Sequence, residues 1–268
     1  MTLNVTREHD GALVLLSFDH GRANEMGRAE LAALERLASE LEADPAAVVL
    51  VSTSRRLTSK GTPVFVAGAN VTERVGWSDA DVKAHVAWQR SVLGRIRHLP
   101  VFHICVVGGM ALGWGTEWLL TADWRIAADE AVFGLPETGL GILPGAGGTA
   151  ELWAHIGVPM ALRLGMTGAR VSPDEALSIG LVQERVADID AGLERAWAMA
   201  AQVATRSPSA NAAFKRALLA AVGQPPAVRQ QLEAAAYDRC VDLGEAAIGR
   251  ARFGREGGLT PWGPKRVN

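Results

Sequence analysis

Short apolar runs and longer amphipathic stretches alternate through the first two-thirds of the chain. The apolar runs predict strands, which lie at Leu13–Phe18, Ala47–Thr53, Val64–Ala67, Pro100–Val107 and Trp124–Ala127. The run Ala47–Thr53 is continuously apolar and β-branched, which is typical of a strand buried on both faces. Apolar residues at spacings of three and four predict helices, which lie at Met26–Ala43, Asp79–His98 and Trp114–Ala122. Strands separated by helices favour an α/β fold with parallel strand pairing.

The last third of the chain has a helical pattern only. We expect Ala-rich helices at Asp190–Arg206 and Pro208–Val222, a break at Pro225-Pro226, and one further helix over Ala227–Arg252. The predicted organisation is therefore an α/β core over residues 1–189 and a helical C-terminal lobe and tail over residues 190–268. Helical lobes of this kind often pack against other subunits, so we expect a homo-oligomer.

Composition narrows the class of protein. The 268 residues carry a formal net charge of −2, with 49% hydrophobic and 21% charged residues, which is typical of a globular protein with a full core. The charge argues against nucleic-acid binding, which depends on Lys and Arg neutralising phosphates. The apolar runs are too short to span a membrane. Two cysteines, Cys105 and Cys240, and no apparent secretory signal favour a cytoplasmic protein.

Most of the candidate chemistry lies in residues 101–149. A predicted buried strand runs into Gly108-Gly109 and then into Gly113-Trp-Gly115, where a helix begins. Glycines let a backbone approach a ligand closely, and a helix start offers unpaired N–H groups to a negative oxygen. Two acids follow, Glu117 and Glu137. A dinucleotide fingerprint is not supported here, because its third glycine would fall on Trp118.

The chain resembles the crotonase (enoyl-CoA hydratase/isomerase) superfamily from about residue 10 to about residue 215. The strongest pieces of the resemblance are Phe65-Val-Ala-Gly-Ala-Asn70, Ala111-Leu-Gly-Trp-Gly-Thr-Glu117, Phe133-Gly-Leu-Pro-Glu137 and Leu140-Gly-Ile-Leu-Pro-Gly-Ala-Gly-Gly-Thr149. Each motif alone is weak evidence, whereas their order and spacing together are specific. The resemblance implies a crotonase-like fold, a spiral of β-β-α repeats with a helical C-terminal lobe. It also implies assembly as a homotrimer or homohexamer.

The resemblance further implies an enzyme that acts on acyl-CoA thioesters. Carried over from the family, the backbone N–H groups of Ala67 and Trp114 would form an oxyanion hole for an enolate. Gly68, Ala69, Gly113 and Gly145 would bind substrate. In the hydratase branch, Glu117 would activate water and Glu137 would deliver a proton, or the two roles would be reversed, giving reversible hydration of a 2-enoyl-CoA. No metal or redox cofactor is implied, and coenzyme A is part of the substrate.

Alternatives within the same fold stay open at this stage. An isomerase or decarboxylase would use the same enolate with another outcome, and a non-catalytic partner would tolerate neutral residues at both glutamates. Trp114 stands where the family usually has glycine, so its indole is expected either to narrow the acyl pocket or to alter its floor. The CoA phosphates need cations, for which Arg55, Arg56, Lys60 and the tail arginines are candidates.

Other conspicuous side chains are expected to be structural. His103 lies in an apolar run and is predicted to be a hydrogen-bonded core residue. Trp118, Trp124 and Trp153 are predicted to pack in the core.

Overall fold

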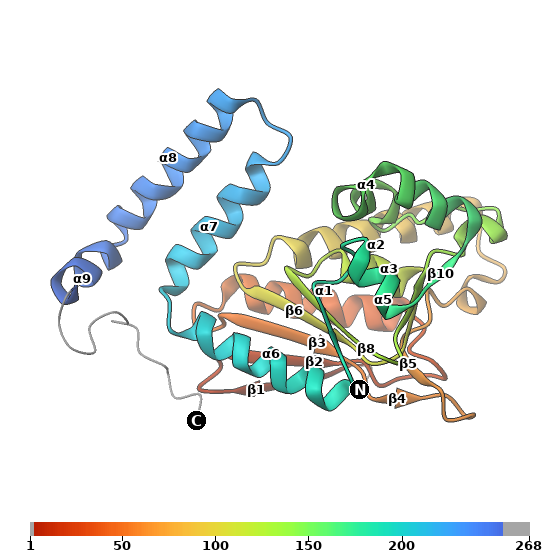
Figure 1. The fold of residues 1–268 in the computed structure, drawn as a ribbon. Coiled ribbons are helices and arrows are strands. Elements are labelled where there is room, and N and C mark those ends of the chain that lie inside the picture. The colour runs from red at the N-terminus through yellow and green to blue at the C-terminus, as the bar shows by residue number, and fades with distance from the viewer. Residues whose placement is uncertain (1–2, 254–268) are drawn as a thin grey trace.

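The computed structural model describes residues 3–253, which form two sheets and their covering helices (Figure 1). The larger sheet has the strand order β1-β2-β3-β6-β8-β11, with bounds Asn4–Glu8, Leu13–Ser17, Val49–Thr53, Phe102–Val107, Trp124–Ala128 and Glu184–Val186. The smaller sheet has the order β10-β9-β7-β5-β4, with bounds Arg170–Val171, Val132–Gly134, Met110–Leu112, Pro63–Val66 and Arg56–Leu57. From β2 to β11 the larger sheet is parallel, and β1 pairs with β2 in the antiparallel sense.

Successive strands divide between the two sheets. β3, β6 and β8 enter the larger sheet, and the strands that follow them, β5, β7 and β9, enter the smaller one. Each such pair precedes a helix: α2 (Asp79–Arg97), α3 (Trp114–Leu119) and α4 (Gly148–Thr167). The chain therefore winds as a spiral of β-β-α repeats, which confirms the predicted fold class.

The core lies on both faces of the larger sheet, because its central strands β3 and β6 are buried at nearly every position. In β3, Leu50 packs into the main cluster beneath α1 (Arg28–Ala43), while Val49 and Val51 face the opposite side. That opposite side is covered by α6 (Ile189–Ala204). Burial on both faces accounts for the continuous apolar run in the sequence.

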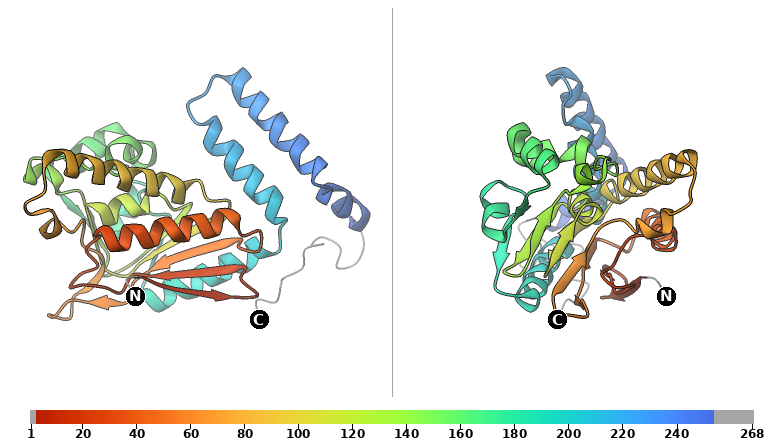
Figure 2. Two further views of the ribbon diagram at one scale, coloured as in Figure 1. Left: turned by 180° about the vertical axis from the view of Figure 1, so that it is seen from behind. Right: turned by 90° about the vertical axis from the view of Figure 1, so that its right-hand side faces the viewer.

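The C-terminal helices form an arm. In Figures 1 and 2, α7 (Pro208–Ala221), α8 (Pro226–Asp242) and α9 (Glu245–Arg252) project away from the sheets. Lys215 fastens α7 to the body, because its Nζ donates to Asp123 Oδ2 at 2.6 Å and to the Val101 carbonyl at 2.9 Å. The division predicted after residue 189 stays a prediction; α6, which follows it at once, packs on the sheet.

Two sequence predictions differ from the observed elements. The single helix expected over Ala227–Arg252 is two helices, because Gly244 adopts a left-handed φ of +79° between α8 and α9. The sequence pattern also missed α4 and α5 (Pro173–Ser178). Within α4 the backbone is non-helical at Gly157, two residues before Pro159, so no regular period marks this helix.

Candidate active site

Three parallel strands of the smaller sheet end at one edge and place the candidate residues there. β7 pairs with β5 on one side and with β9 on the other, all in the parallel sense. The segments that leave these strands carry Ala69 after β5, Trp114 and Glu117 after β7, and Glu137 after β9. Ligands of parallel sheets commonly bind beyond the carboxyl ends of the strands. Residues far apart in the sequence are therefore brought to a common edge by strand pairing.

The segment after β5 corrects one predicted oxyanion donor. The Ala67 N–H donates to the Ala23 carbonyl at 3.0 Å, so it is already paired and the prediction for Ala67 is wrong. Met26 holds the next turn, because its N–H donates to the Gly68 carbonyl and its carbonyl accepts from the Asn70 N–H, both at 2.9 Å. Among the described residues no acceptor pairs with the Ala69 N–H. Ala69 therefore presents the unpaired donor that the sequence reading assigned to Ala67.

Glycines shape the start of α3. Gly113 has a φ of +53°, and a Cβ there would lie 2.7 Å from Glu137 Oε1. A Cβ on Gly115 would lie 2.2 Å from the Val66 carbonyl oxygen, so α3 packs directly against β5. Trp114 is the first residue of α3, and the N–H groups of a first turn have no acceptor within their own helix. The Trp114 N–H therefore has no acceptor within its own helix, and its part in an oxyanion hole stays a prediction.

Glu117 is a buried carboxylate held by a backbone clamp. Its side chain lies on α3 and the residue is 4% exposed. Oε1 accepts the N–H of Ala146 at 2.7 Å and the N–H of Gly148 at 2.8 Å. Burial raises the pKa of Glu117, and these backbone hydrogen bonds partly oppose the rise by favouring the charged form. Oε2 accepts no hydrogen bond from the described residues, which leaves it free for a ligand.

Glu137 differs from Glu117 in its environment. It begins the short 3-10 helix η2 (Glu137–Leu140), and its buried Oε2 has no hydrogen-bond partner among the described residues. Burial raises the pKa of Glu137 to about 7, and the nearby charge of Glu117 adds to the rise. Near neutral pH this carboxyl is therefore partly protonated. This edge of the smaller sheet thus holds two carboxyl groups. Glu117 is fixed by hydrogen bonds from two backbone N–H groups, and Glu137 can donate a proton near neutral pH.

A cavity of about 360 Å³ opens beside Glu117. Its walls come from α2, through Arg90 and Leu93, and from the loop that precedes α4. Arg90 Nε donates to the Gly145 carbonyl at 2.9 Å, and a Cβ on Gly145 would lie 2.8 Å from Val86 Cγ1. Gly145, predicted to bind substrate, therefore sits where the loop presses on α2. The positive charge of Arg90 also acts on Glu117 and favours its ionised form.

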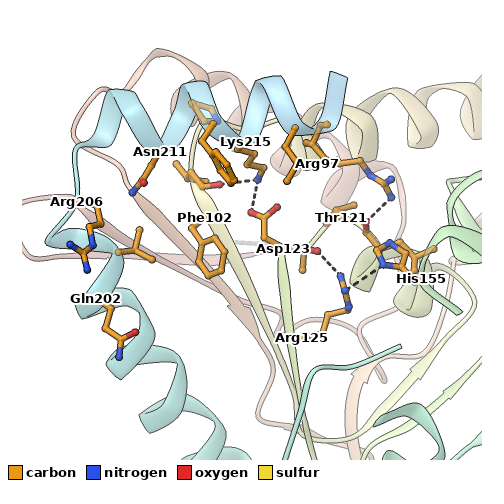
Figure 3. Close-up of a pocket in the computed structure, with 18 residues that line it drawn as sticks. Arg97, Phe102, Thr121, Asp123, Arg125, His155, Gln202, Arg206, Asn211 and Lys215 are labelled. Atoms are coloured by element: carbon orange, nitrogen blue, oxygen red, sulfur yellow. Dashed lines mark hydrogen bonds and ion pairs between the residues drawn. The ribbon is translucent and has the colours of Figure 1, made fainter. Parts of the chain in front are cut away.

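A larger cavity of about 610 Å³ lies elsewhere, between the body and α7 (Figure 3). Of the cations that line it, Arg97, Arg125 and Lys215 are already paired, whereas the side chain of Arg206 has no partner among the described residues. Arg125 donates to the carbonyls of Ala122 at 2.6 Å and Leu181 at 2.8 Å, and Lys215 is bound to Asp123. The cavity holds no pair of acids and lies away from the edge described above. Glu117 lines the smaller cavity, whereas neither Glu117 nor Glu137 lines the larger one, so we place the candidate site on the side of Glu117.

The indole of Trp114 packs in the core. It is 2% exposed and stacks on Trp118, with ring centroids 5.6 Å apart. It does not line the cavity beside Glu117, so the expected narrowing of an acyl pocket by Trp114 is not observed there. Trp118 Nε1 donates to Ser52 Oγ at 2.9 Å, and the same hydroxyl contacts His103 Nε2 at 2.8 Å. His103 is fully buried with a pKa lowered to about 3, which confirms it as a core residue.

The predicted phosphate-binding cations are only partly described. Arg55 pairs with Asp190, and Arg56 pairs with Asp19. The arginines of the tail beyond residue 253 lie outside the described residues. Within residues 3–253, no group of three or more His, Cys, Asp or Glu side chains could hold a metal ion.

Sequence reasoning missed the groups that orient Glu117. These are the N–H groups of Ala146 and Gly148, together with Arg90, which fixes their loop. The glycine-rich run before α4 was the available signal, since a backbone without side chains can approach a carboxylate closely. A Cβ on Gly148 would lie 3.2 Å from Glu117 Oε1.

Comparisons with known proteins agree with this arrangement. The family model described as "Enoyl-CoA hydratase/isomerase" matches residues 20–253. A mouse protein named "Enoyl-CoA hydratase domain-containing protein 2, mitochondrial" is 36% identical over 209 residues, which span 77% of this chain and 69% of that protein. A "Short-chain-enoyl-CoA hydratase" from Clostridium acetobutylicum is 32% identical over 216 residues, 80% of each chain. The crystal structure of an enoyl-CoA hydratase from Bacillus anthracis superposes with a TM-score of 0.86 at 31% identity, covering 94% of this chain and 96% of that one.

Proposed function

The chain belongs to the enoyl-CoA hydratase/isomerase family, and from this premise we propose that it catalyses the reversible hydration of a 2-enoyl-CoA to a 3-hydroxyacyl-CoA. The observation that carries the proposal is the pair of acids at one strand edge, the buried Glu117 and the partly buried Glu137. Hydration needs both a base for water and an acid for the α-carbon. An isomerase or a decarboxylase can proceed with fewer acids, so two of them in different environments favour hydration.

The thioester carbonyl would bind between the N–H groups of Ala69 and Trp114. Both donors are main-chain groups in the segments that follow the neighbouring parallel strands β5 and β7, and both are unpaired among the described residues. They would polarise the carbonyl and hold the negative oxygen of the enolate. Loss of one such donor typically costs roughly 3–4 kcal/mol of transition-state stabilisation. Because the donors are backbone N–H groups, changes of side chain at these positions are tolerated whereas proline is not.

The two acids would divide the work according to their surroundings. Glu117, clamped through Oε1, would take a proton from water with its open Oε2 while the water oxygen bonds to the β-carbon. The electron pair of the double bond then passes to the enolate oxygen. Glu137, with its pKa near 7, would give its proton to the α-carbon as the enolate collapses. Proton exchange with solvent returns Glu117 to its anion and Glu137 to its acid, so the cycle needs no metal or redox cofactor.

We also propose that the protein assembles as a homotrimer or homohexamer, which the exposed apolar residues support. On the arm, Phe214 and Tyr237 are each 70% exposed. On α4, Met166 is 72% exposed and Trp153, predicted to be in the core, is 51% exposed. Two apolar faces on one chain suit contacts between copies. Light scattering coupled to size-exclusion chromatography tests this, and a monomeric mass would contradict it.

The compartment stays a prediction. In the part of the chain that the structure describes, no helix is long and apolar enough to cross a membrane. The sequence favours the cytoplasm, whereas the mouse relative is named as a mitochondrial protein. Fractionation of cells that make the protein tests the prediction.

The deciding experiment is a mass-spectrometric panel of acyl-CoA thioesters incubated with wild type, Glu117→Gln and Glu137→Gln. The exposed Glu130→Gln is a matched control, because Glu130 lies away from the edge. Gain of water by an enoyl-CoA, lost in both active-site variants and kept in the control, is the expected result. Loss of carbon dioxide, or a shifted double bond without gain of water, would move the assignment to a decarboxylase or an isomerase. Binding without any turnover would indicate a non-catalytic partner.

A further inference from the structure

Three buried nitrogens near the candidate site have no hydrogen-bond partner among the described residues. They are Arg74 Nε, His85 Nδ1 and Gln89 Nε2. His85 and Gln89 are 4% and 3% exposed. Buried polar atoms in folded proteins are nearly always paired, because an unpaired donor loses its hydration without gaining a substitute. Three such nitrogens close together therefore form a buried group of side chains that can bind an acceptor.

The three residues, which we call the polar cluster, lie against one another. His85 and Gln89 are one turn apart on the buried face of α2. Arg74 Nη2 lies 3.5 Å from Gln89 Oε1, a long contact that leaves the guanidinium free to take a better partner. Trp77 and Trp88 enclose the His85 ring at centroid distances of 5.2 and 5.9 Å. The cluster is thus shielded by apolar rings on α2 and on the segment before it.

The polar cluster is joined to the candidate site at two points along the chain. Arg74 ends the 3-10 helix η1 (Thr72–Arg74), which begins three residues after the proposed oxyanion donor Ala69. Arg90 follows Gln89 on α2 and lines the cavity beside Glu117. The cluster therefore lies on the two segments, η1 and α2, that lead away from Ala69 and from that cavity.

The charge around the polar cluster favours an anion. Arg74 is a cation, and the neighbouring acid, Glu73, already accepts the Arg28 N–H with both oxygens, at 3.3 and 3.0 Å. Burial and the charge of Arg74 lower the pKa of His85, so that ring is neutral and can offer one N–H. A carboxylate has enough lone pairs to accept from all three side chains at once, and hydrogen bonds to an ionised group are stronger than those to a neutral one.

We propose that the polar cluster of Arg74, His85 and Gln89 binds a carboxylate at the far end of the acyl chain, so that the preferred substrates are thioesters of dicarboxylic acids. This rests on the proposed function only in that an acyl-CoA binds at this edge. Arg74 is half-buried, whereas His85 and Gln89 are buried, so Arg74 is the most exposed member of the cluster.

Binding of saturated, unreactive thioesters tests the proposal without depending on turnover. Calorimetric titration would compare adipoyl-CoA with hexanoyl-CoA, which has the same chain length without the carboxylate. Shorter and longer pairs would be compared in the same way, from succinyl-CoA with butanoyl-CoA to suberoyl-CoA with octanoyl-CoA. Wild type should bind the best carboxylated member at least about tenfold more tightly than its plain partner, as a charge-assisted contact implies. The methyl ester of adipoyl-CoA separates the contribution of charge from that of the acceptor.

Variants place the effect at the polar cluster. Arg74→Met and Gln89→Leu should each reduce the ratio of the affinity for the carboxylated thioester to the affinity for its plain partner by about tenfold. Arg36→Met, an exposed arginine on α1, is the matched control and should keep it. Arg74 is only half-buried, so its variant should fold even if the Gln89 variant does not. Equal affinity for both members of every pair, or a ratio unchanged in Arg74→Met, would overturn the inference and leave the proposed function standing. Failure of every thioester to bind would overturn both.

Discussion

Replacing Glu137 by glutamine should stabilise the protein in a pH-dependent way. In the folded chain the Glu137 carboxyl keeps its proton up to a pKa of about 7, because burial and the charge of Glu117 oppose its ionisation. In the unfolded chain the same carboxyl ionises near its ordinary pKa of 4.5. The folded state therefore binds more protons between these two values, and its stability falls as the pH rises through this window. Glutamine has no such titration.

The size of the effect follows from the two pKa values. The difference between 4.5 and about 7 corresponds to at most about 3 kcal/mol, at roughly 1.4 kcal/mol for each tenfold change in proton affinity. Glu137 is only partly buried, so solvent screening lowers the expected value to about 1–2 kcal/mol. The difference in the free energy of unfolding between Glu137→Gln and wild type should be smallest below pH 4.5, grow towards pH 7 and stay constant above it.

Urea unfolding at pH 5 and pH 8 measures this prediction. Wild type, Glu137→Gln and the exposed control Glu130→Gln would be compared at one protein concentration, because assembly also adds to apparent stability. The free energy of unfolding of Glu137→Gln relative to wild type should be higher at pH 8 than at pH 5, and the control should show no such change. A difference that stays flat or shrinks as the pH rises would refute the assignment of the raised pKa to Glu137.

Three further predictions concern activity and the core. Hydration should slow as the pH rises through about 7, since Glu137 must be protonated to give its proton, and a pH–kcat profile checks this. Gly113→Ala should lower kcat/KM at least about tenfold with the fold retained, because its Cβ would lie 2.7 Å from Glu137 Oε1; unchanged kinetics with a normal melting curve would refute it. Ser52→Ala should lower the free energy of unfolding by about 1–3 kcal/mol, since Trp118 Nε1 and His103 Nε2 both lose their buried partner; thermal unfolding of the variant gives the value.

The sequence predicted the elements whose periodicity is strong. The leucines of α1 recur at helical spacing, and the strand β3 is apolar on both faces, so both were located to within two residues. β7 and β9 were not predicted, because strands of three residues carry too few positions to show a period. α4 escaped for a related reason, since Gly157 and Pro159 interrupt its pattern.

The candidate site shows a similar limit. Glu117 and Glu137 were chosen by resemblance, and the structure places both at the strand edge. The identity of the free backbone donor could not be inferred, because the pairing of the Ala67 N–H depends on the Ala23 carbonyl, which lies far earlier in the chain. Whether a main-chain N–H is paired is a property of tertiary packing. No local pattern of residue types contains that information.

The second strand of each β-β-α repeat pairs in the smaller sheet. The relative positions of the candidate site residues therefore depend on strand pairing in that sheet and not on the length of the loops that join the strands. Ala69, Trp114 and Glu137 are held at fixed relative positions by the pairing of β5, β7 and β9, whatever number of residues joins them. An insertion at an exposed turn such as Gly61, where nothing crowds the backbone, would lengthen the chain and leave the edge intact. A slip of one residue in β7 would instead turn every side chain of that strand to the opposite face. Natural selection can thus lengthen or shorten the connecting loops freely, while the register of three short strands stays under strict constraint.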